Sequence, residues 1–340
     1  MNVLSLFDGM SCGQIALNRA GIKYDNYFAS EIKKHAIKVT QHNYPDTIQL
    51  GDVTKIDVSQ LPKIDLLIGG SPCQDFSSAN KDKKGLDGLK SGLFYQYLRI
   101  LKEAKPKYFL LENVDMDDYS YNKISNLLET YPVRINSSLV SAQLRERLYW
   151  TNIGPEHFDM FGFRYSDIPQ PIDKKVYLQD ILESGYSERL KARCILESES
   201  RPLTSKDKLF RRYKEHGFIN LVFKDKDIFE RIKIEYGKSK YNEINQLNHL
   251  NEWANSTRQQ NRIYATIGKS NCLTKTHKES LFFDGENIRI LSQTELERLQ
   301  TVPEGYTSLL SRNDAACLLG DGWTVDVISH IFKYINYDKR

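Results

Sequence analysis

The sequence predicts an α/β fold, in which a mostly parallel sheet carries helices on both faces and is joined to a smaller, less regular domain. Two observations lead to this prediction. Short apolar runs alternate with helical stretches over the first half of the chain, which is typical of strands that are buried on both faces. The pattern is then lost between residues 186 and 285, where Lys, Arg, Asn and Gln are frequent.

The first expected strand is the apolar run at residues 3–7, which a turn joins to a helical stretch that stops at Gly21. Further strands are expected at 27–30, 64–70, 108–113 and 147–151, with a strand end at 50–53. In a Rossmann-like parallel sheet, ligands bind at the edge where the strands reach their carboxyl ends. The side chains that lie at or just after such ends are those of Asp8, Glu31, Asp52, Cys73 and Glu112.

The chain of 340 residues exceeds a typical domain of about 150 residues, which indicates two domains or one domain with a large insertion. We expect the first domain at residues 1–185, the second at 186–288, and a return to the first at 289–340. In the last part, the spacing of apolar residues predicts helices at 293–300 and 324–334.

Composition argues against several classes of protein. No stretch approaches the roughly 18 apolar residues of a membrane span, and the N-terminus lacks the pattern of a secretion signal. The five cysteines are scattered without a CxxC pair, so we expect neither a disulfide framework nor a metal site, and a reducing cytoplasm fits. A net charge of +4 is a weak indication of an anionic partner.

Cys73 follows a turn that is suited to presenting a reactive thiol. The strand at 64–70 ends in Gly69-Gly70, and Pro72 then fixes the backbone directly before the cysteine. Glycines allow a ligand to approach the backbone closely, and a thiolate held at a sheet edge can act as a nucleophile. For an isolated cysteine, the alternative of a buried thiol behind a tight turn would be the better interpretation.

The turn at residues 7–13 contains two glycines and joins the first strand to the first helix, as in cofactor cradles, although it does not match GxGxxG. Glu31 ends the second strand, where an acid can hold ribose hydroxyls, and Asp52 ends the next. Either acid could instead be a helix cap.

Glu112 places a carboxyl group at the end of a buried strand, which makes it a candidate proton donor. The alternative is a solvated acid at a strand end. Arg145 and Arg147 share one face of an extended segment, so they could grip a base carbonyl or a phosphate. Their alternative is a surface salt bridge.

Taken together and in this order, the motifs resemble those of the DNA cytosine-C5 methyltransferase family, in a bacterial or phage-type form whose cofactor motifs are nearest to the animal de novo branch. The resemblance covers the first ~150 and the last ~55 residues. It rests on the cofactor turn, the Pro-Cys motif, Glu-Asn-Val, Gln-x-Arg-x-Arg, the segment from Arg289 to Gln300, and Gly320-Asp321-Gly322-Trp323-Thr324-Val325. Cys12 and Asp321 depart from the common pattern, which has Gly and Asn there.

This resemblance implies methyl transfer from S-adenosylmethionine to C5 of cytosine in double-stranded DNA, with no metal. Cys73 would attack C6, Glu112 would protonate or hydrogen-bond N3, and Arg147, assisted by Arg145, would hold the carbonyl at C2. The target base would be flipped out of the duplex, as in other DNA methyltransferases. The cofactor residues implied are Phe7, Asp8, Gly9, Met10, Ser11, Cys12, Glu31, Asp52, Val53, Thr54, Pro72, Leu93, Asp321, Gly322 and Trp323.

Two segments are candidates for DNA contact. Residues 75–93 combine glycines with Lys81, Lys83 and Lys84, which suits a loop that closes over the base, although a solvated loop is the alternative. The second domain, as a target-recognition domain, would read bases. Its candidate readers are Gln260, Arg262, Lys269 and Thr274. We expect a monomer in a bacterial or phage-infected cytoplasm, with a cognate restriction endonuclease as a possible partner.

Three rival functions remain. A tRNA cytosine-C5 methyltransferase is nearest, because one branch of the same family acts on tRNA, but the polar block at 186–285 favours DNA. A nicotinamide-dependent dehydrogenase would use a similar sheet, and the missing GxGxxG counts against it. A DNA-binding module without activity conflicts with the presence of Cys73, Glu112 and Arg147.

Overall fold

The computed structural model describes residues 1–72, 92–160, 162–195, 213, 220–230 and 288–335, and the backbone of 264–265 and 282–283. The helices are α1 (Cys12–Arg19), α2 (Lys34–Asn43), α3 (Gly92–Ala104), α4 (Asp118–Leu128), α5 (Leu178–Ile181), α8 (Gln293–Leu299), α9 (Arg312–Asp321) and α10 (Val325–Phe332), with 3-10 turns at Val53–Lys55, Val58–Gln60 and Ser137–Leu139. The strands are β1 (Asn2–Leu6), β2 (Asn26–Ser30), β3 (Ile48–Gln49), β4 (Leu66–Gly70), β5 (Tyr108–Asn113), β6 (Val133–Asn136), β7 (Gln143–Leu144), β8 (Glu146–Thr151), β9 (Glu156–Phe158), β10 (Arg164–Ser166), β11 (Ala192–Arg193), β12 (Leu221–Phe223), β13 (Tyr264–Ala265), β14 (Phe282–Phe283) and β15 (Ile288–Ile290).

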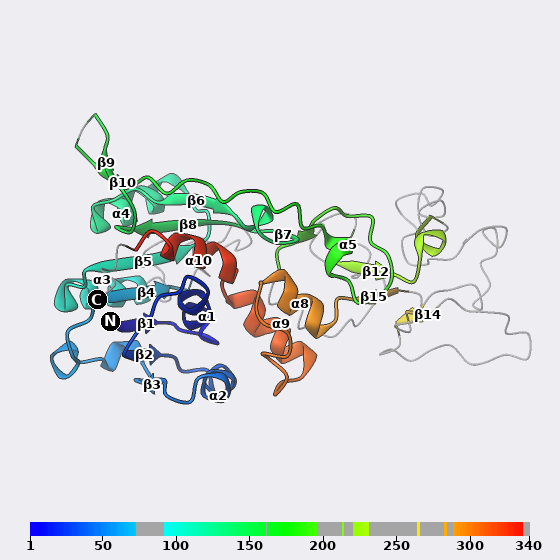
Figure 1. Ribbon diagram of the computed structural model, residues 1–340, viewed down its shortest axis with the longest axis horizontal. Coiled ribbons are helices and arrows are strands. Elements are labelled where there is room, and N and C mark those ends of the chain that lie inside the picture. Colours follow the sequence, from blue (N-terminus) through cyan, green and yellow to red (C-terminus); the bar gives the residue numbers. More distant parts are fainter. Residues whose placement is uncertain are drawn as a thin grey trace, which may run out of the picture.

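A seven-stranded sheet forms the centre of the fold, in the order β3-β2-β1-β4-β5-β8-β6 (Figure 1). The pairs from β3 to β5 are parallel, and β8 is antiparallel to both of its neighbours, β5 and β6. The mostly parallel sheet predicted from the apolar runs is therefore confirmed.

Helices bury both faces of the sheet. Successive side chains of each strand point to opposite faces, so each strand contributes to two cores. On one face, Val3 and Ile68 pack into a core that also contains apolar residues of α1 and α10. These two helices pack against each other in front of the sheet in Figure 1. On the other face, Leu4 and Leu67 pack with residues of α3 and α4. This two-sided burial explains why the strands consist of continuous apolar runs.

The strand order reverses at β1, which pairs with β2 on one side and with β4 on the other. Such a switch point opens a crevice at the carboxyl ends of the strands, because the connections leave in opposite directions. The turn after β1 and the Ser71-Pro72 segment after β4 therefore meet at one edge of the sheet.

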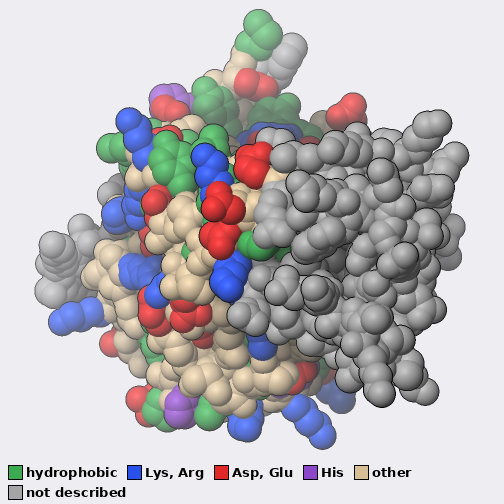
Figure 2. Space-filling model, turned by 90° about the vertical axis from the view of Figure 1, so that its right-hand side faces the viewer, with side chains coloured by type: hydrophobic (Ala, Val, Ile, Leu, Met, Phe, Trp, Pro, Cys, Tyr) green, Lys and Arg blue, Asp and Glu red, His purple; other side chains and the backbone are tan. Residues whose placement is uncertain are grey.

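Beyond the sheet, two short pairings join distant segments of the chain. Ala192 and Arg193 of β11 pair with Gln143 and Leu144 of β7, and β12 pairs antiparallel with β15. Figure 2 shows one end of the molecule, on whose described part Lys and Arg side chains are interspersed with Asp and Glu side chains. In the part of the chain that the structure describes, no helix is long and apolar enough to cross a membrane.

Candidate active site

The turn between β1 and α1 has an unusual backbone. Phe7 and Ser11 adopt left-handed φ angles of 58° and 64°, and Gly9 lies between them at 60°. For residues other than glycine this conformation costs of the order of 1–3 kcal/mol and persists where the surroundings enforce it. Here the amide of Asp8 donates to the Ser30 carbonyl at 3.1 Å, and that of Gly9 to Glu31 Oε2 at 2.9 Å. The end of β2 therefore holds the predicted cofactor turn in shape.

Glu31 and Asp52 differ in what they do within the fold. Besides Gly9, Glu31 accepts the amides of Ile32 and Lys33 at its other oxygen, at 2.7 and 2.8 Å. Asp52 is the cap of the turn at Val53–Lys55, where its Oδ1 accepts both the amide and the hydroxyl of Thr54 at 2.9 Å. These two hydrogen bonds lower the pKa of Asp52. The helix-cap alternative is thus observed for Asp52, and its role toward a cofactor stays a prediction.

The carboxyl group of Asp8 lies among hydroxyl groups beneath the turn. Ser11 Oγ donates to Asp8 Oδ2 at 2.6 Å, and Tyr27 OH donates to Oδ1 at 2.8 Å. Burial raises the pKa of Asp8 from 3.8 to about 6, although the hydrogen bonds from Ser11, Ser5 and Tyr27 act in the opposite direction. The folded protein therefore holds a proton on Asp8 in a pH range where the unfolded chain does not.

From the raised pKa of Asp8 we predict how the stability difference between the wild type and Asp8→Asn depends on pH. Between pH 4 and 6, Asp8 binds up to one proton more in the folded wild type than in the unfolded chain, so its contribution to the free energy of unfolding should fall as the pH rises. Relative to Asp8→Asn, which does not titrate, the wild type should lose up to about 3 kcal/mol across this window. Urea denaturation at pH values from 4 to 7.5 measures the difference. Parallel stability curves for the two proteins would show that Asp8 is ionised as in solution.

Glu112 is the centre of the cluster at the end of β5, and it is 8% exposed. Arg147 Nε lies 3.0 Å from Glu112 Oε1, and Trp323 Nε1 donates to Oε2 at 3.1 Å. Gly70 of β4 is the register partner of Glu112. A Cβ atom at residue 70 would lie 2.9 Å from Glu112 Oε2 and 3.0 Å from Trp323 Nε1. The second glycine of the Gly69-Gly70 pair therefore makes room for the protein's own carboxylate and indole.

The segment that leads to the candidate nucleophile is tied to the same strand. Asn113 follows Glu112 on β5, and its Nδ2 donates to Ser71 Oγ at 3.1 Å. Its Oδ1 accepts the amide of Val114 at 2.8 Å. Because Ser71 precedes Pro72, these bonds fix the last described residues before Cys73 beside the Glu112 carboxylate. The sequence offered Asn113 as part of a motif without indicating this role.

The two arginines that the sequence placed together have different partners. Arg147 pairs with Glu112, whereas Arg145 is almost fully buried and donates to the carbonyls of Gly320 and Gly322 at 3.1 and 2.8 Å. Both guanidinium groups also donate to Cys194 Sγ. Arg145 thus holds the backbone that carries Trp323, and Arg147 is the arginine in contact with the carboxylate.

The segment at 320–324 is held by further side chains that the sequence did not single out as functional. Gln300 Oε1 accepts from Thr324 Oγ1 at 2.8 Å and from Gln143 Nε2 at 3.3 Å. Asp321 forms an ion pair with Lys33 at 2.6 Å. Burial raises the pKa of Cys12, which packs beneath this segment, to about 12, so the thiol stays protonated. The two departures from the common motif pattern therefore have partners within the fold.

Some of the remaining predicted residues lie within the described part of the chain, and others lie outside it. Met10 and Val53 are buried, Pro72 directly precedes the stretch 73–91, and Leu93 is the second residue after it. Outside the described residues lie Cys73, Lys81, Lys83, Lys84, Gln260, Arg262, Lys269 and Thr274.

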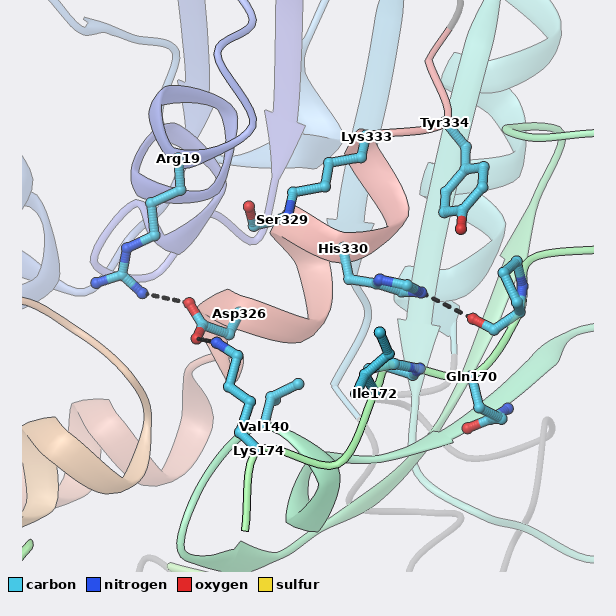
Figure 3. Close-up of a pocket in the computed structure, with 12 residues that line it drawn as sticks. Arg19, Val140, Gln170, Ile172, Lys174, Asp326, Ser329, His330, Lys333 and Tyr334 are labelled. Carbon is cyan, nitrogen blue, oxygen red and sulfur yellow. Dashed lines mark hydrogen bonds and ion pairs between the residues drawn. The ribbon is translucent and has the colours of Figure 1, made fainter. Parts of the chain in front are cut away.

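A separate pocket of about 640 Å³ lies between α10, the end of α1 and the segment at 169–174 (Figure 3). Asp326 pairs there with Arg19 and Lys174, and His330 Nε2 lies 2.7 Å from the Pro169 carbonyl oxygen. Among the residues that the structure describes, none of those predicted for the active site lines this pocket.

Comparison with solved structures supports the fold assignment. EhMeth, a methyltransferase of Entamoeba histolytica, has a TM-score of 0.62 at 15% identity, with 98% of this chain and 97% of that chain covered. DNMT2 of Spodoptera frugiperda, in a mutant form, has a TM-score of 0.59 at 16% identity, with 98% of both chains covered. At these identities the likeness shows the fold alone.

Sequence relatives include proteins of phages and bacteria. An orphan methyltransferase of Bacillus phage SPR is 39% identical over 162 residues, which cover 44% of this chain and 37% of the phage protein. A Type II methyltransferase of Neisseria gonorrhoeae is 32% identical over 246 residues, which cover 66% of this chain and 53% of the relative. The matched part thus spans about half or less of these relatives. The model of the family described as C-5 cytosine-specific DNA methylase matches residues 1–337. The resemblance inferred from the motifs is therefore confirmed, and the chain belongs to the family of C-5 cytosine-specific DNA methylases.

Proposed function

We propose that this protein transfers a methyl group from S-adenosylmethionine to C5 of a specific cytosine in double-stranded DNA. The observation that supports this most is the arrangement around Glu112. Its carboxylate is held by Arg147 on one side and by Trp323 on the other, directly beside the end of β4 from which Pro72 leads to Cys73. In the proposal, Glu112 is the proton donor and Arg147 the cation at this edge of the sheet, and the chain continues from Pro72 to the nucleophile Cys73.

In the proposed mechanism, the Cys73 thiolate adds to C6 of a cytosine that has been flipped out of the duplex. Glu112 donates a proton or a hydrogen bond to N3, which stabilises the charge that develops on the ring. Arg147 holds the C2 carbonyl, and its contact with Glu112 keeps the two groups in register. After the methyl group has been transferred to C5, which leaves S-adenosylhomocysteine, water accepts the C5 proton and Cys73 Sγ departs from C6. A proton that Glu112 has given to N3 returns to its carboxylate, and the aromatic ring is restored.

The cofactor supplies an electrophilic methyl group when bound. The residues of the crevice fit such a group. Gly9 and Gly51 have φ angles of 60° and 72°, and a Cβ atom at either would meet nothing within 4 Å. Glu31 accepts three amide hydrogens, and a carboxylate offers about four acceptor positions. One position is left for a ribose hydroxyl at the end of β2.

The partner of the site would be duplex DNA, with bases read by the region between 186 and 288. Relatives of the chain include Type II methyltransferases and phage orphan methyltransferases. The proposal therefore includes two settings, one with a cognate restriction endonuclease and one without, in the cytoplasm of a bacterial or phage-infected cell where the DNA lies.

Tritium transfer from labelled S-adenosylmethionine tests this function directly. We expect label in duplex DNA of mixed sequence and none in tRNA, and bisulfite sequencing of the product should show one recurring site. Duplex DNA in which 5-methylcytosine replaces every cytosine is the matched control, because its acceptor position is blocked. Label in tRNA alone would favour the tRNA methyltransferase, and label in neither substrate would refute the proposal.

A further inference from the structure

Cys194 lies at the point where the two arginines of the site converge. Its Sγ accepts hydrogen bonds from Arg145 Nη1 at 3.2 Å and from Arg147 Nη2 at 3.8 Å. The thiol donates in turn to the carbonyl of Ile195 at 3.6 Å. The sulfur atom is thus the common partner of two positively charged groups.

The backbone on both sides of Cys194 is fixed, which makes the position of its sulfur well defined. Arg193 pairs with Leu144 in the short ladder of β11 and β7. The amide of Ile195 donates to Gln143 Oε1 at 2.9 Å, and the Gln143 side chain also contacts Gln300. Cys194 is therefore held by the same network that holds the segment before Trp323.

Besides this sulfur, each arginine contacts a different part of the site. Arg147 reaches the Glu112 carboxylate, and Arg145 reaches the carbonyls of Gly320 and Gly322. Without the sulfur, Arg147 would keep Glu112 and the Glu146 carbonyl as partners but lose its only described contact with the β11 segment. The guanidinium plane of Arg147 would then be free to rotate while its ion pair with Glu112 is kept.

We propose that Cys194 is a positioning residue, whose sulfur sets the orientation of Arg147 against Glu112 and couples it through Arg145 to the Trp323 segment. This role rests on the proposed function, because it concerns the geometry of methyl transfer. It also assigns a task at the active site to the first residues of the predicted recognition domain, since Cys194 lies beyond residue 186.

The charge environment of the thiol agrees with this geometry. Burial raises the pKa of Cys194, but the nearby charges of Arg145 and Arg147 outweigh burial, so that its pKa lies below the ordinary value of 9.0. The charged groups in this cluster are Arg145, Arg147 and, on the far side of Arg147, Glu112. A thiol in contact with two cations should react with alkylating agents at lower pH than an ordinary thiol.

Steady-state kinetics test the positioning role. For Cys194→Ala we expect kcat to fall about tenfold, with KM for DNA and for S-adenosylmethionine changed less than about twofold, since orientation rather than binding is lost. Cys194→Ser should recover kcat to within about threefold of the wild type, because a hydroxyl keeps the same donor and acceptor pattern. Cys317→Ala is the matched control, since it removes another half-buried thiol, which lies on α9. A Cys194→Ala enzyme that is folded and has wild-type kcat would overturn the role.

Alkylation tests the contact without relying on activity. The rate of iodoacetamide labelling at Cys194 is followed against pH by peptide mass spectrometry, in a Cys73→Ala protein and in the same protein with Arg147→Gln. We expect the labelling profile of Cys194 to move to higher pH when Arg147 is replaced, while that of Cys317 does not move. An unmoved Cys194 profile would overturn the proposed contact. Should the wild type transfer no methyl group to any substrate, the proposed function fails, and the positioning role fails with it even if the labelling profile moves.

Discussion

A Cys73→Ala protein should fold and bind duplex DNA, yet transfer no measurable methyl group. C5 of cytosine is a poor nucleophile, and addition of a thiolate at C6 makes it enamine-like, so removing the sulfur removes the route itself. Ser at the same position should be as inactive, because its hydroxyl is far less acidic than a thiol. Tritium incorporation measures turnover, and fluorescence anisotropy of a labelled duplex measures binding.

Cys317→Ala serves as the control for this change, because it removes a half-buried thiol from α9 and should keep normal turnover. Normal turnover by either Cys73 variant would exclude Cys73 as the nucleophile. Loss of DNA binding together with turnover would instead point to a structural role for the cysteine.

Glu112→Gln should lower kcat by about 10²–10⁴, the range that a positioned general acid contributes. The amide has nearly the size of the carboxyl group, so the close contact with Gly70 and the acceptor for Trp323 Nε1 can both be kept. What is lost is the ion pair with Arg147 and the proton that the acid supplies to N3. Affinity for S-adenosylmethionine, measured by calorimetry, should change little.

The control for this variant is Glu103→Gln on α3. Glu103 also pairs with an arginine, Arg99, but both side chains are partly exposed and such pairs contribute little. A rate for Glu112→Gln equal to that of Glu103→Gln would remove Glu112 from the mechanism.

Strands β1, β2, β4, β5 and β8 could be predicted to within two residues because they are buried on both faces. The strand end expected at 50–53 lies after β3, which is formed by Ile48–Gln49. Residues 108–113 were expected as a strand and form β5, and 27–30 lie within β2. The edge strand β6 was not predicted, since Arg134 and Asn136 break its apolar pattern and pairing with β8 holds it instead. Helix α9 was also missed, and it begins at a Ser311 cap that the sequence-level pattern did not bring out.

For the site, the sequence indicated which residues end the strands, and the parallel sheet then brings those ends to one edge. Contacts between distant segments could not be predicted in this way. Trp323 donates to Glu112 across 211 residues of sequence, and Cys194 joins two arginines almost 50 positions earlier. The spacing of apolar residues predicts helices and strands, but it does not predict which distant residues are in contact. The same limit explains why the contacts of Arg145 with the carbonyls of Gly320 and Gly322 were not predicted, while its assisting role at the base stays a prediction.

The covalent step can be tested most directly with duplex DNA that carries 5-fluorocytosine at the methylation site. Fluorine at C5 prevents loss of the proton there, so Cys73 cannot leave C6 once methyl transfer has taken place. In the presence of S-adenosylmethionine, the wild type should accumulate a protein–DNA complex that survives denaturing electrophoresis and whose mass includes the cross-linked peptide of Cys73, and Cys73→Ala should form none. Binding of this DNA without any adduct would contradict a covalent mechanism.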